Sequence, residues 1–302
     1  LLLLAGLVAA LWPKGSPLRS PEGEITALIG PSGCGKTTLI RCFNRMNDLV
    51  DGVRIEGHIE LDGQDIFEKK VQVAELRRRV GMVFQDFALF PHLTVERNLA
   101  FGLRRLPRRE RKNRISELLR LVGLEHAARQ YPHQLSGGMC QRVMIAMAIA
   151  CNPRLLIADE PTTALDVTIQ AQILDLMNKL KDETGSAILF ISHDLGVIAE
   201  MAQNVAVMYA GKVMEYTDVK TIYANPKNPY TIGLLESIPV LGRESKENRL
   251  KTISGVVPSL LNLPSGCLYS DRCPDVFSDC RQLEPQMVPV ADNHYVRCLK
   301  YA

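Results

Sequence analysis

Short apolar runs alternate with helix-like segments along most of this chain. The runs at residues 25–29, 155–158 and 187–191 are continuous, which is typical of parallel strands buried on both faces. From Ile115 onward, apolar residues recur at i, i+3, i+4 and i+7, which predicts an amphipathic helix over residues 110–122. Strands that alternate with helices predict an α/β fold with a largely parallel sheet.

The remaining elements follow from the same patterns. Asp51-Gly52 and Asp62-Gly63 are turn signals within a β-rich stretch, after which a strand is expected to end at Gln85. The strands at 155–158 and 187–191 are expected to be parallel and joined by a right-handed crossover. Helices are expected over residues 38–46, 141–150 and 168–182.

A phosphate-binding pattern, G-x-x-x-x-G-K-[ST], lies between the first apolar run and the helix that follows it. A Gly-rich loop in this position points successive backbone N–H groups at the phosphates of a nucleotide. Lys36 is expected to contact the β- and γ-phosphates, and the Thr37 hydroxyl to hold Mg²⁺. The alternative is a Gly-rich turn that matches by chance. The predicted loop comprises Gly30, Pro31, Ser32, Gly33, Cys34, Gly35, Lys36 and Thr37, followed by Thr38.

Two adjacent carboxylates end the apolar run at residues 155–158. Ligands of open α/β sheets bind at the carboxyl ends of the strands, and Asp159 and Glu160 fall at such an end. Asp159 is expected to orient the Mg²⁺ shell, and Glu160 to polarise the attacking water.

Further motifs follow in a fixed order. They are Leu135-Ser136-Gly137-Gly138-Met139, Thr163-Ala164-Leu165-Asp166 and Ser192-His193-Asp194. With these motifs, the chain resembles the ATPase subunit of an ATP-binding-cassette (ABC) transporter from about Gly23 to its C-terminus. The resemblance implies a P-loop NTPase fold with an inserted α-helical subdomain.

The resemblance also implies roles for single residues. Gln85 resembles the glutamine that contacts Mg²⁺ and senses the membrane partner, and His193 resembles the histidine that contacts the γ-phosphate. Asp166 resembles the loop aspartate that crosses the dimer. Ser136, Gly137 and Gly138 resemble the signature that binds the partner subunit's nucleotide. Taken singly, His193 also fits a capping residue and Gln85 a polar strand end, but the ordered spacing favours the functional interpretation.

The family works in assemblies, which implies partners for this chain. Two ATP molecules are expected to lie between two ATPase subunits, either identical or different. Transmembrane permease subunits are the further partners, and an extracytoplasmic substrate-binding protein acts indirectly. The implied location is peripheral, on the cytoplasmic face of the inner membrane.

Composition changes this interpretation little. The 302 residues are 46% hydrophobic and 23% charged, with a net charge of +3, so we expect no nucleic-acid partner. Residues 104–114 are locally basic. They fit a solvated helix face, or a surface near lipid headgroups or a membrane subunit. Residues 1–12 are almost wholly apolar but fall short of the roughly 20 residues that span a bilayer. The family resemblance implies an aromatic residue that stacks on adenine, and Trp12 is the candidate for it, although it lies closer to the phosphate loop than the family pattern places it.

We divide the chain into three parts. Residues 1–20 form an atypical apolar segment, and residues 21–225 the ABC ATPase domain, with its helical subdomain at about 88–152. A stretch rich in Pro and Asn then introduces an extension, residues 226–302, which resembles the C-terminal region of oligopeptide and dipeptide importer ATPases.

The extension carries cysteines in the pattern C-x5-C-x6-C-x17-C, namely Cys267, Cys273, Cys280 and Cys298. This spacing lacks the close pairs of common zinc sites, and a protein that uses cytosolic ATP works in a reducing compartment, which disfavours two disulfides. Members of the peptide-importer family can hold a [4Fe-4S] cluster on such cysteines. We therefore favour a cluster, followed by zinc and then by unligated thiols.

Different parts of the chain agree on the ATP chemistry but resemble importers of different cargo. Residues 40–83 resemble a phosphate-importer ATPase, whereas the chain from Tyr131 onward resembles peptide importers. The sequence therefore favours an ATPase that powers a peptide importer, with a phosphate importer as the alternative. A soluble ABC ATPase in translation or DNA repair, and a metal-cluster module with a regulatory cassette, are alternatives of other classes.

Overall fold

The apolar runs at residues 155–158 and 187–191 form β5 (Leu155–Asp159) and β6 (Ala187–Ile191) in the computed structural model. The model describes residues 21–302 apart from 54, 56, 164, 238–251 and 261. The described residues divide into two compact units, residues 21–25 with 68–192 and residues 26–67 with 193–302, which are described in turn. Predictions for residues 1–20, including Trp12, lie outside the described part.

In the unit that contains residues 68–192, β4 (Val80–Val83) pairs with β5, and β5 pairs with β6, both in parallel. Every residue of β5 and β6 is buried, as continuous apolar runs predict. The pairing confirms the parallel arrangement expected from the sequence. This sheet brings the ends of β4, β5 and β6 to one edge, where Gln85, Asp159 and Ser192 follow or end the strands.

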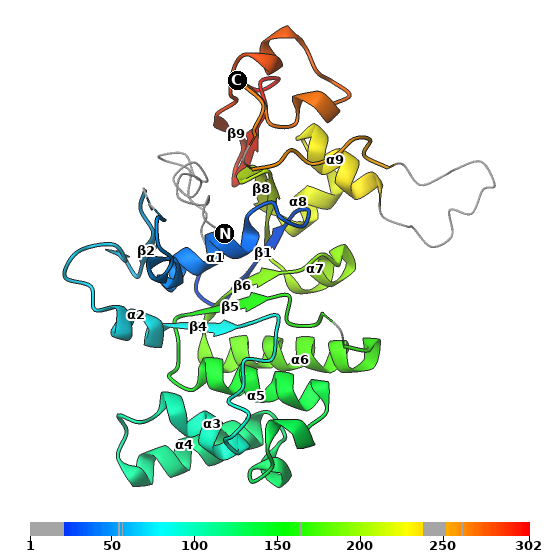
Figure 1. Ribbon diagram of the computed structural model, residues 1–302. Coiled ribbons are helices and arrows are strands. Elements are labelled where there is room, and N and C mark those ends of the chain that lie inside the picture. The colour runs from blue at the N-terminus through cyan, green and yellow to red at the C-terminus, as the bar shows by residue number, and fades with distance from the viewer. Residues whose placement is uncertain (1–20, 54, 56, 164, 238–251, 261) are drawn as a thin grey trace. The chain divides into compact units, whose positions relative to one another are not determined.

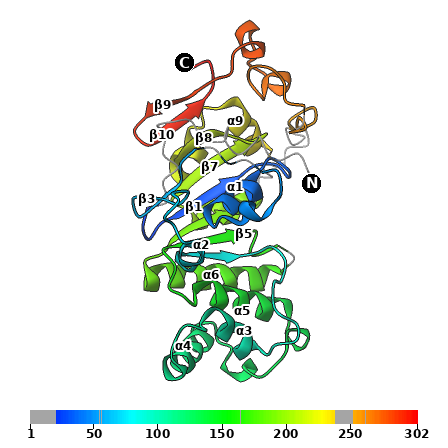
Figure 2. The same cartoon turned by 60° about the vertical axis from the view of Figure 1, so that its left-hand side comes forward.

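Helices cover this sheet in layers. Figures 1 and 2 show α5 (Gly137–Ile149) and α6 (Val167–Thr184) beside β4 and β5, with α3 (Val95–Gly102) and α4 (Arg108–Leu121) on the far side of α5. Helix α2 (Val73–Arg79) leads directly into β4. Short 3-10 turns lie at Glu125–Ala127 and Pro132–Gln134. The signature motif is thereby placed at the start of a helix that packs on the strands.

The other unit contains β1 (Ile25–Ile29) from its second residue onward, and here β1 pairs in parallel with β7 (Asn204–Tyr209). Strand β7 turns into antiparallel β8 (Lys212–Asp218) through Ala210 and Gly211, which both have positive φ, the backbone that a two-residue hairpin requires. The helices of this unit are α1 (Lys36–Phe43), α7 (Leu195–Met201), α8 (Val219–Ala224) and α9 (Pro229–Glu236).

A second short hairpin confirms the turn predicted at Asp62-Gly63. Strands β2 (Glu60–Leu61) and β3 (Gln64–Asp65) pair around these two residues, whose φ values are 53° and 73°. Short 3-10 turns of this unit lie at Met46–Leu49, Ser270–Arg272 and Ser278–Arg281.

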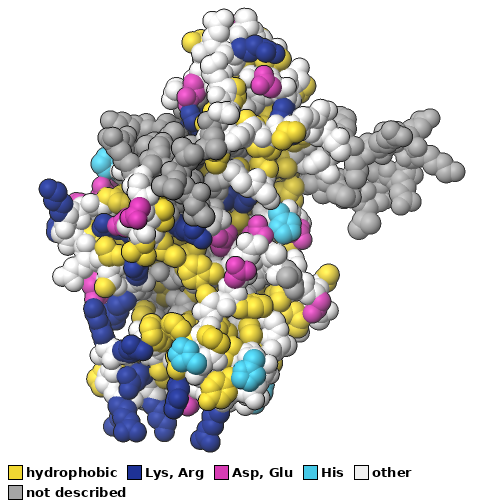
Figure 3. Space-filling model, in the orientation of Figure 1, with side chains coloured by type: hydrophobic (Ala, Val, Ile, Leu, Met, Phe, Trp, Pro, Cys, Tyr) yellow, Lys and Arg dark blue, Asp and Glu magenta, His cyan; other side chains and the backbone are white. Residues whose placement is uncertain are grey.

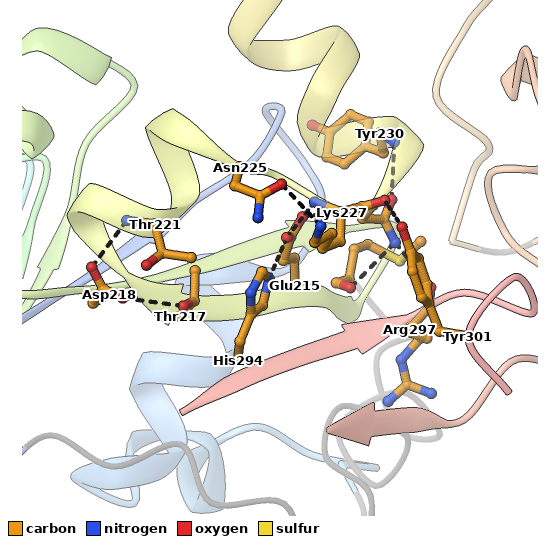
Figure 4. A network of polar contacts seen from close by, with 12 residues as sticks. Glu215, Thr217, Asp218, Thr221, Asn225, Lys227, Tyr230, His294, Arg297 and Tyr301 are labelled. Carbon is orange, nitrogen blue, oxygen red and sulfur yellow. Dashed lines mark hydrogen bonds and ion pairs between the residues drawn. The ribbon is translucent and has the colours of Figure 1, made fainter. Parts of the chain in front are cut away.

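The chain ends in a hairpin, β9 (Met287–Ala291) and β10 (His294–Arg297), and β10 pairs with β8. A buried polar network joins β8 and β10 (Figure 4). Glu215, which is fully buried, accepts hydrogen bonds from the backbone N–H groups of Lys227 and Asn228 and contacts the His294 ring. Asn228 donates to the carbonyl oxygens of Met214 and Arg297. Residues 212–228 and the C-terminal hairpin therefore form one packed structure.

Several sequence-based boundaries were wrong by a few residues. The helix after the phosphate loop begins at Lys36 rather than 38, and the signature helix begins at Gly137 rather than 141. The strand expected to end at Gln85 ends at Val83. Both helices begin inside a Gly-rich motif, because the glycines there adopt helical or cap conformations that propensity alone disfavours.

Candidate active site

The phosphate-loop lysine is folded back over its own loop. The Nζ of Lys36 donates to the carbonyl oxygens of Gly30 at 2.8 Å and Pro31 at 3.1 Å, and the side chain is 8% exposed. These carbonyls hold a buried cation beside the loop backbone, where it can meet a phosphate oxygen. Burial also raises the pKa of the neighbouring Cys34 thiol, which keeps that side chain neutral.

Glycines are required at two positions of this loop. A Cβ at Gly30, whose φ is 154°, would lie 2.3 Å from the carbonyl oxygen of Met208 in β7. Gly35 caps α1 with a φ of 99°, a left-handed conformation that residues with a side chain seldom adopt. The close strand contact and the left-handed cap together fix the path of the loop.

The start of α1 differs from the starts of the other helices that carry motifs. The N-cap side chains of α5, α6 and α7, namely Ser136, Asp166 and Asp194, each accept a hydrogen bond from a backbone N–H of their helix. Gly35 has no side chain to do so. The first N–H groups of α1 therefore lack a side-chain cap and, with the helix dipole, form a suitable site for an anion.

The paired carboxylates lie at the end of β5, as predicted. Asp159 is its last residue and is 7% exposed. Glu160 has a φ of 48°, which is strained for a residue with a side chain. Its Oε2 accepts a hydrogen bond of 2.9 Å from the Thr163 hydroxyl, and its N–H donates to the carbonyl of Ile191 at 3.1 Å. These contacts hold the Glu160 carboxylate in a defined position beyond the strand.

The signature residues occupy the exposed first turn of α5. Ser136 and Gly137 are exposed, and the Ser136 Oγ accepts from the N–H of Met139 at 3.3 Å. Gly138 is buried against α6. A Cβ at this position would lie 2.6 Å from the Ile169 side chain. The glycine pair thus has two roles: Gly137 leaves the helix start accessible, and Gly138 allows α5 to approach α6.

The remaining predicted site residues lie on loops. Gln85 is exposed just beyond β4, and His193 is exposed in the connection between β6 and α7. Asp166 caps α6, since its Oδ1 accepts a hydrogen bond from the backbone N–H of Ile169. The phosphate loop and His193 belong to the unit of residues 26–67 and 193–302, and the other residues predicted for the ATP site belong to the unit of residues 68–192.

Comparison with known proteins identifies the family. Residues 14–163 match the model of the ABC transporter family. A Brucella ovis protein named for peptide import and ATP binding is 45% identical over 92% of this chain and 88% of its own length. The chain belongs to the ABC transporter ATP-binding proteins. As a member of this family it is an ATPase with the P-loop NTPase fold, in which ATP hydrolysis powers transport.

Further comparisons of this ABC ATPase find the same family. The oligopeptide transport ATP-binding protein AppD of Bacillus subtilis is 42% identical over 93% of this chain and 88% of its own length. Residues 214–280 match the model of the oligopeptide/dipeptide transporter C-terminal region. The solved structure of CbiO1 from Clostridium perfringens, part of the ABC transporter complex cbiONQ, has a TM-score of 0.61 and 33% identity. That likeness covers 68% of this chain and 80% of CbiO1.

The structure brings the four cysteines of the extension around one pocket. Cys267, Cys273, Cys280 and Cys298 line it together with Arg297 and Lys300. All four are free, and burial raises the pKa of Cys273 to about 11. Within the described ranges, however, no three His, Cys, Asp or Glu side chains converge closely enough to hold one metal ion. The predicted [4Fe-4S] cluster and its zinc alternative are therefore not confirmed.

Sequence reasoning missed the polar groups that fix the surroundings of these sites. Asn98 is fully buried, accepts from the N–H of Phe90, and donates to the carbonyls of Phe90, Leu93 and Thr94. It thereby fixes the loop between β4 and α3. Glu215 and His294 were missed likewise, because a buried polar residue looks like a surface residue in the sequence.

None of the helices in the described part is both long and apolar enough to cross a bilayer.

Proposed function

We propose that this chain is the ATP-hydrolysing subunit of a membrane importer of peptides. The main observation behind this proposal is the phosphate loop, in which Lys36 is held over the loop and α1 begins without a side-chain cap. The relatives named for peptide import and oligopeptide transport support the cargo. They do not favour the phosphate alternative suggested by residues 40–83.

The chemistry assigns roles to the side chains. ATP binds through the loop from Gly30 to Thr38, with Lys36 on its β- and γ-phosphates. Thr37, Gln85 and Asp159 would hold Mg²⁺, which when bound would supply charge neutralisation on the transferred phosphoryl group. Glu160 accepts a proton from the attacking water, and the hydrogen bond from Thr163 orients its carboxylate. His193 contacts the γ-phosphate.

The working form is an assembly. ABC importer ATPases dimerise and pair with transmembrane permease subunits. We propose that Ser136, Gly137 and Gly138 meet the nucleotide held by the partner subunit, and that Asp166 crosses the dimer. The exposure of Ser136 and Gly137 supports this. The assembly would sit on the cytoplasmic face of the inner membrane, with a helical subdomain near residues 88–152 and a C-terminal extension from 226.

For the extension, we keep the [4Fe-4S] cluster as the hypothesis for Cys267, Cys273, Cys280 and Cys298. Four free thiols around one pocket are the donor type that such clusters use. The cations of Arg297 and Lys300 in the same lining suit a negatively charged thiolate site. The extension is separate from the ATP motifs in sequence, so hydrolysis does not depend on this hypothesis.

Substitution of Glu160 tests the hydrolytic role. Glu160→Gln should retain ATP binding and lose turnover by about 10²-fold or more, because amide nitrogen and oxygen cannot take the proton. Glu200→Gln, an exposed carboxylate on α7, is the matched control and should keep full turnover. Unchanged turnover in Glu160→Gln would contradict the role of Glu160. The cargo is tested separately, by whether the permease subunits that copurify with the chain import labelled peptides.

A further inference from the structure

Basic side chains gather without acidic partners at the start of α4. Arg108, Arg109, Arg111 and Lys112 lie in its first five positions, and all but the half-buried Arg111 are exposed. Their neighbours are paired, since Arg105 contacts Glu75 and Arg114 contacts Glu117. In the part of the chain that the structure describes, no ion pair involves the four. Their charge is therefore available to an external partner.

This arrangement works against the stability of the helix. The N-terminal end of a helix carries partial positive charge, so cations in the first turn are unfavourable and carboxylates are favourable. Helix α4 has Glu110 as the only acid of its first turn, next to Arg108 and Arg109. Cations three or four positions apart on a helix, such as Arg108 and Lys112, also repel one another. Folding alone does not explain this pattern.

The charged region continues onto an exposed aromatic ring. Phe101, at the end of α3, is 41% exposed, and the Arg104 guanidinium lies 4.0 Å from the centre of its ring. Figure 3 shows Lys and Arg side chains gathered over the region where Figure 1 places α3 and α4. We call Arg104, Arg108, Arg109, Arg111 and Lys112 the basic face.

We propose that the basic face binds the anionic headgroups of a phospholipid bilayer. Clusters of four to eight Lys and Arg residues attract negatively charged membrane surfaces. The cations here are spread over a loop and one helix end, without the paired fork that fixes a single carboxylate. A fluid bilayer fits such a spread because its headgroups rearrange beneath each charge, and Phe101 supplies an apolar group for the interface. A fixed acidic protein surface is the competing partner.

Vesicle binding by the purified full chain tests the proposal. Wild-type protein should cosediment with vesicles of neutral phosphatidylcholine containing 30% phosphatidylglycerol, and far less with phosphatidylcholine alone. The test variant carries Arg108→Gln, Arg109→Gln, Arg111→Gln and Lys112→Gln. Each basic residue near such a surface contributes roughly a fivefold factor to partitioning, so the joint loss of the four should weaken binding by about 600-fold. Salt near 1 M should have a similar effect on the wild type, because it shortens the screening length to about 3 Å.

A charge-matched control separates the basic face from net charge. Lys69→Gln, Lys70→Gln, Lys179→Gln and Lys220→Gln remove the same charge from exposed lysines outside the basic face and should leave vesicle binding within about threefold of wild type. The basic-face variant should also melt no lower than wild type, because the removed charges oppose the helix dipole. Equal loss in both variants would overturn the proposal, as would absence of charge-dependent vesicle binding, the outcome expected for an acidic protein partner.

Discussion

The Glu215 carboxylate lies 2.7 Å from the Nε2 of His294, and neither side chain has appreciable contact with solvent. Glu215 belongs to β8, and His294 begins the last strand, β10. The same carboxylate accepts from the backbone N–H groups of Lys227 and Asn228. A single buried side chain thus joins β8, the segment before α9 and the C-terminal hairpin.

We expect Glu215→Ala to lower the free energy of unfolding by about 3 to 5 kcal/mol. The change leaves a buried imidazole and two backbone N–H groups without their acceptor, which is the costly way to break a buried polar pair. Urea unfolding followed by circular dichroism measures it. Glu200→Ala, on an exposed face of α7, should change stability by no more than about 0.5 kcal/mol. A loss below 1 kcal/mol in Glu215→Ala would show that the hairpin does not depend on this carboxylate.

The sequence predicted the elements whose signal is local. The apolar runs predicted β5 and β6 because a strand buried on both faces consists of apolar residues. The turn at Asp62-Gly63 was predicted because positive φ favours these residue types. The motifs located the loop of Lys36 and the strand end of Glu160. The structure adds what no pattern contains, including the strained φ of Glu160 and the buried hydrogen bonds of Asn98. Those contacts join residues that are remote or unremarkable in sequence.

Gly30→Ala should abolish nucleotide binding and destabilise the fold. A Cβ at this position meets the carbonyl oxygen of Met208 at 2.3 Å, so either the loop or β7 must shift. Gly52→Ala is the matched control, because Gly52 also has positive φ, at 78°, yet a Cβ there meets nothing within 4 Å. Gly30→Ala should cost about 1 to 3 kcal/mol more than the control. Urea unfolding and titration with a fluorescent ATP analogue measure both effects. Equal behaviour of the two variants would contradict the importance of the β7 contact.

Mixing two inactive chains tests the proposed dimer. Lys36→Ala disables a nucleotide site through its own loop, whereas Ser136→Arg disables the site of the partner subunit. In a mixed dimer, one composite site then carries both lesions and the other carries neither. Ser136 is exposed, so a long side chain at this position can extend into solvent and the variant should fold. We expect ATP-dependent dimers and partial ATPase activity on mixing. Full activity of either variant alone, or of wild-type protein that stays monomeric at every concentration, would contradict the shared sites.

The cysteine pocket can be tested by its metal content. Protein purified without oxygen should be brown and contain about four iron and four sulfide per chain, because iron-sulfur clusters absorb visible light and zinc does not. Cys273→Ser removes one of the four thiols that line the pocket and should lose the colour, whereas Cys151→Ser changes a cysteine outside it and should keep the colour. Metal ligation supports the local fold where ligands come from short segments, so Cys273→Ser should also expose residues 265–300 to protease.

Colourless protein with one zinc per chain would replace the cluster by zinc. Protein that binds neither metal under these conditions would leave the four cysteines as unligated thiols, in agreement with the raised pKa of Cys273.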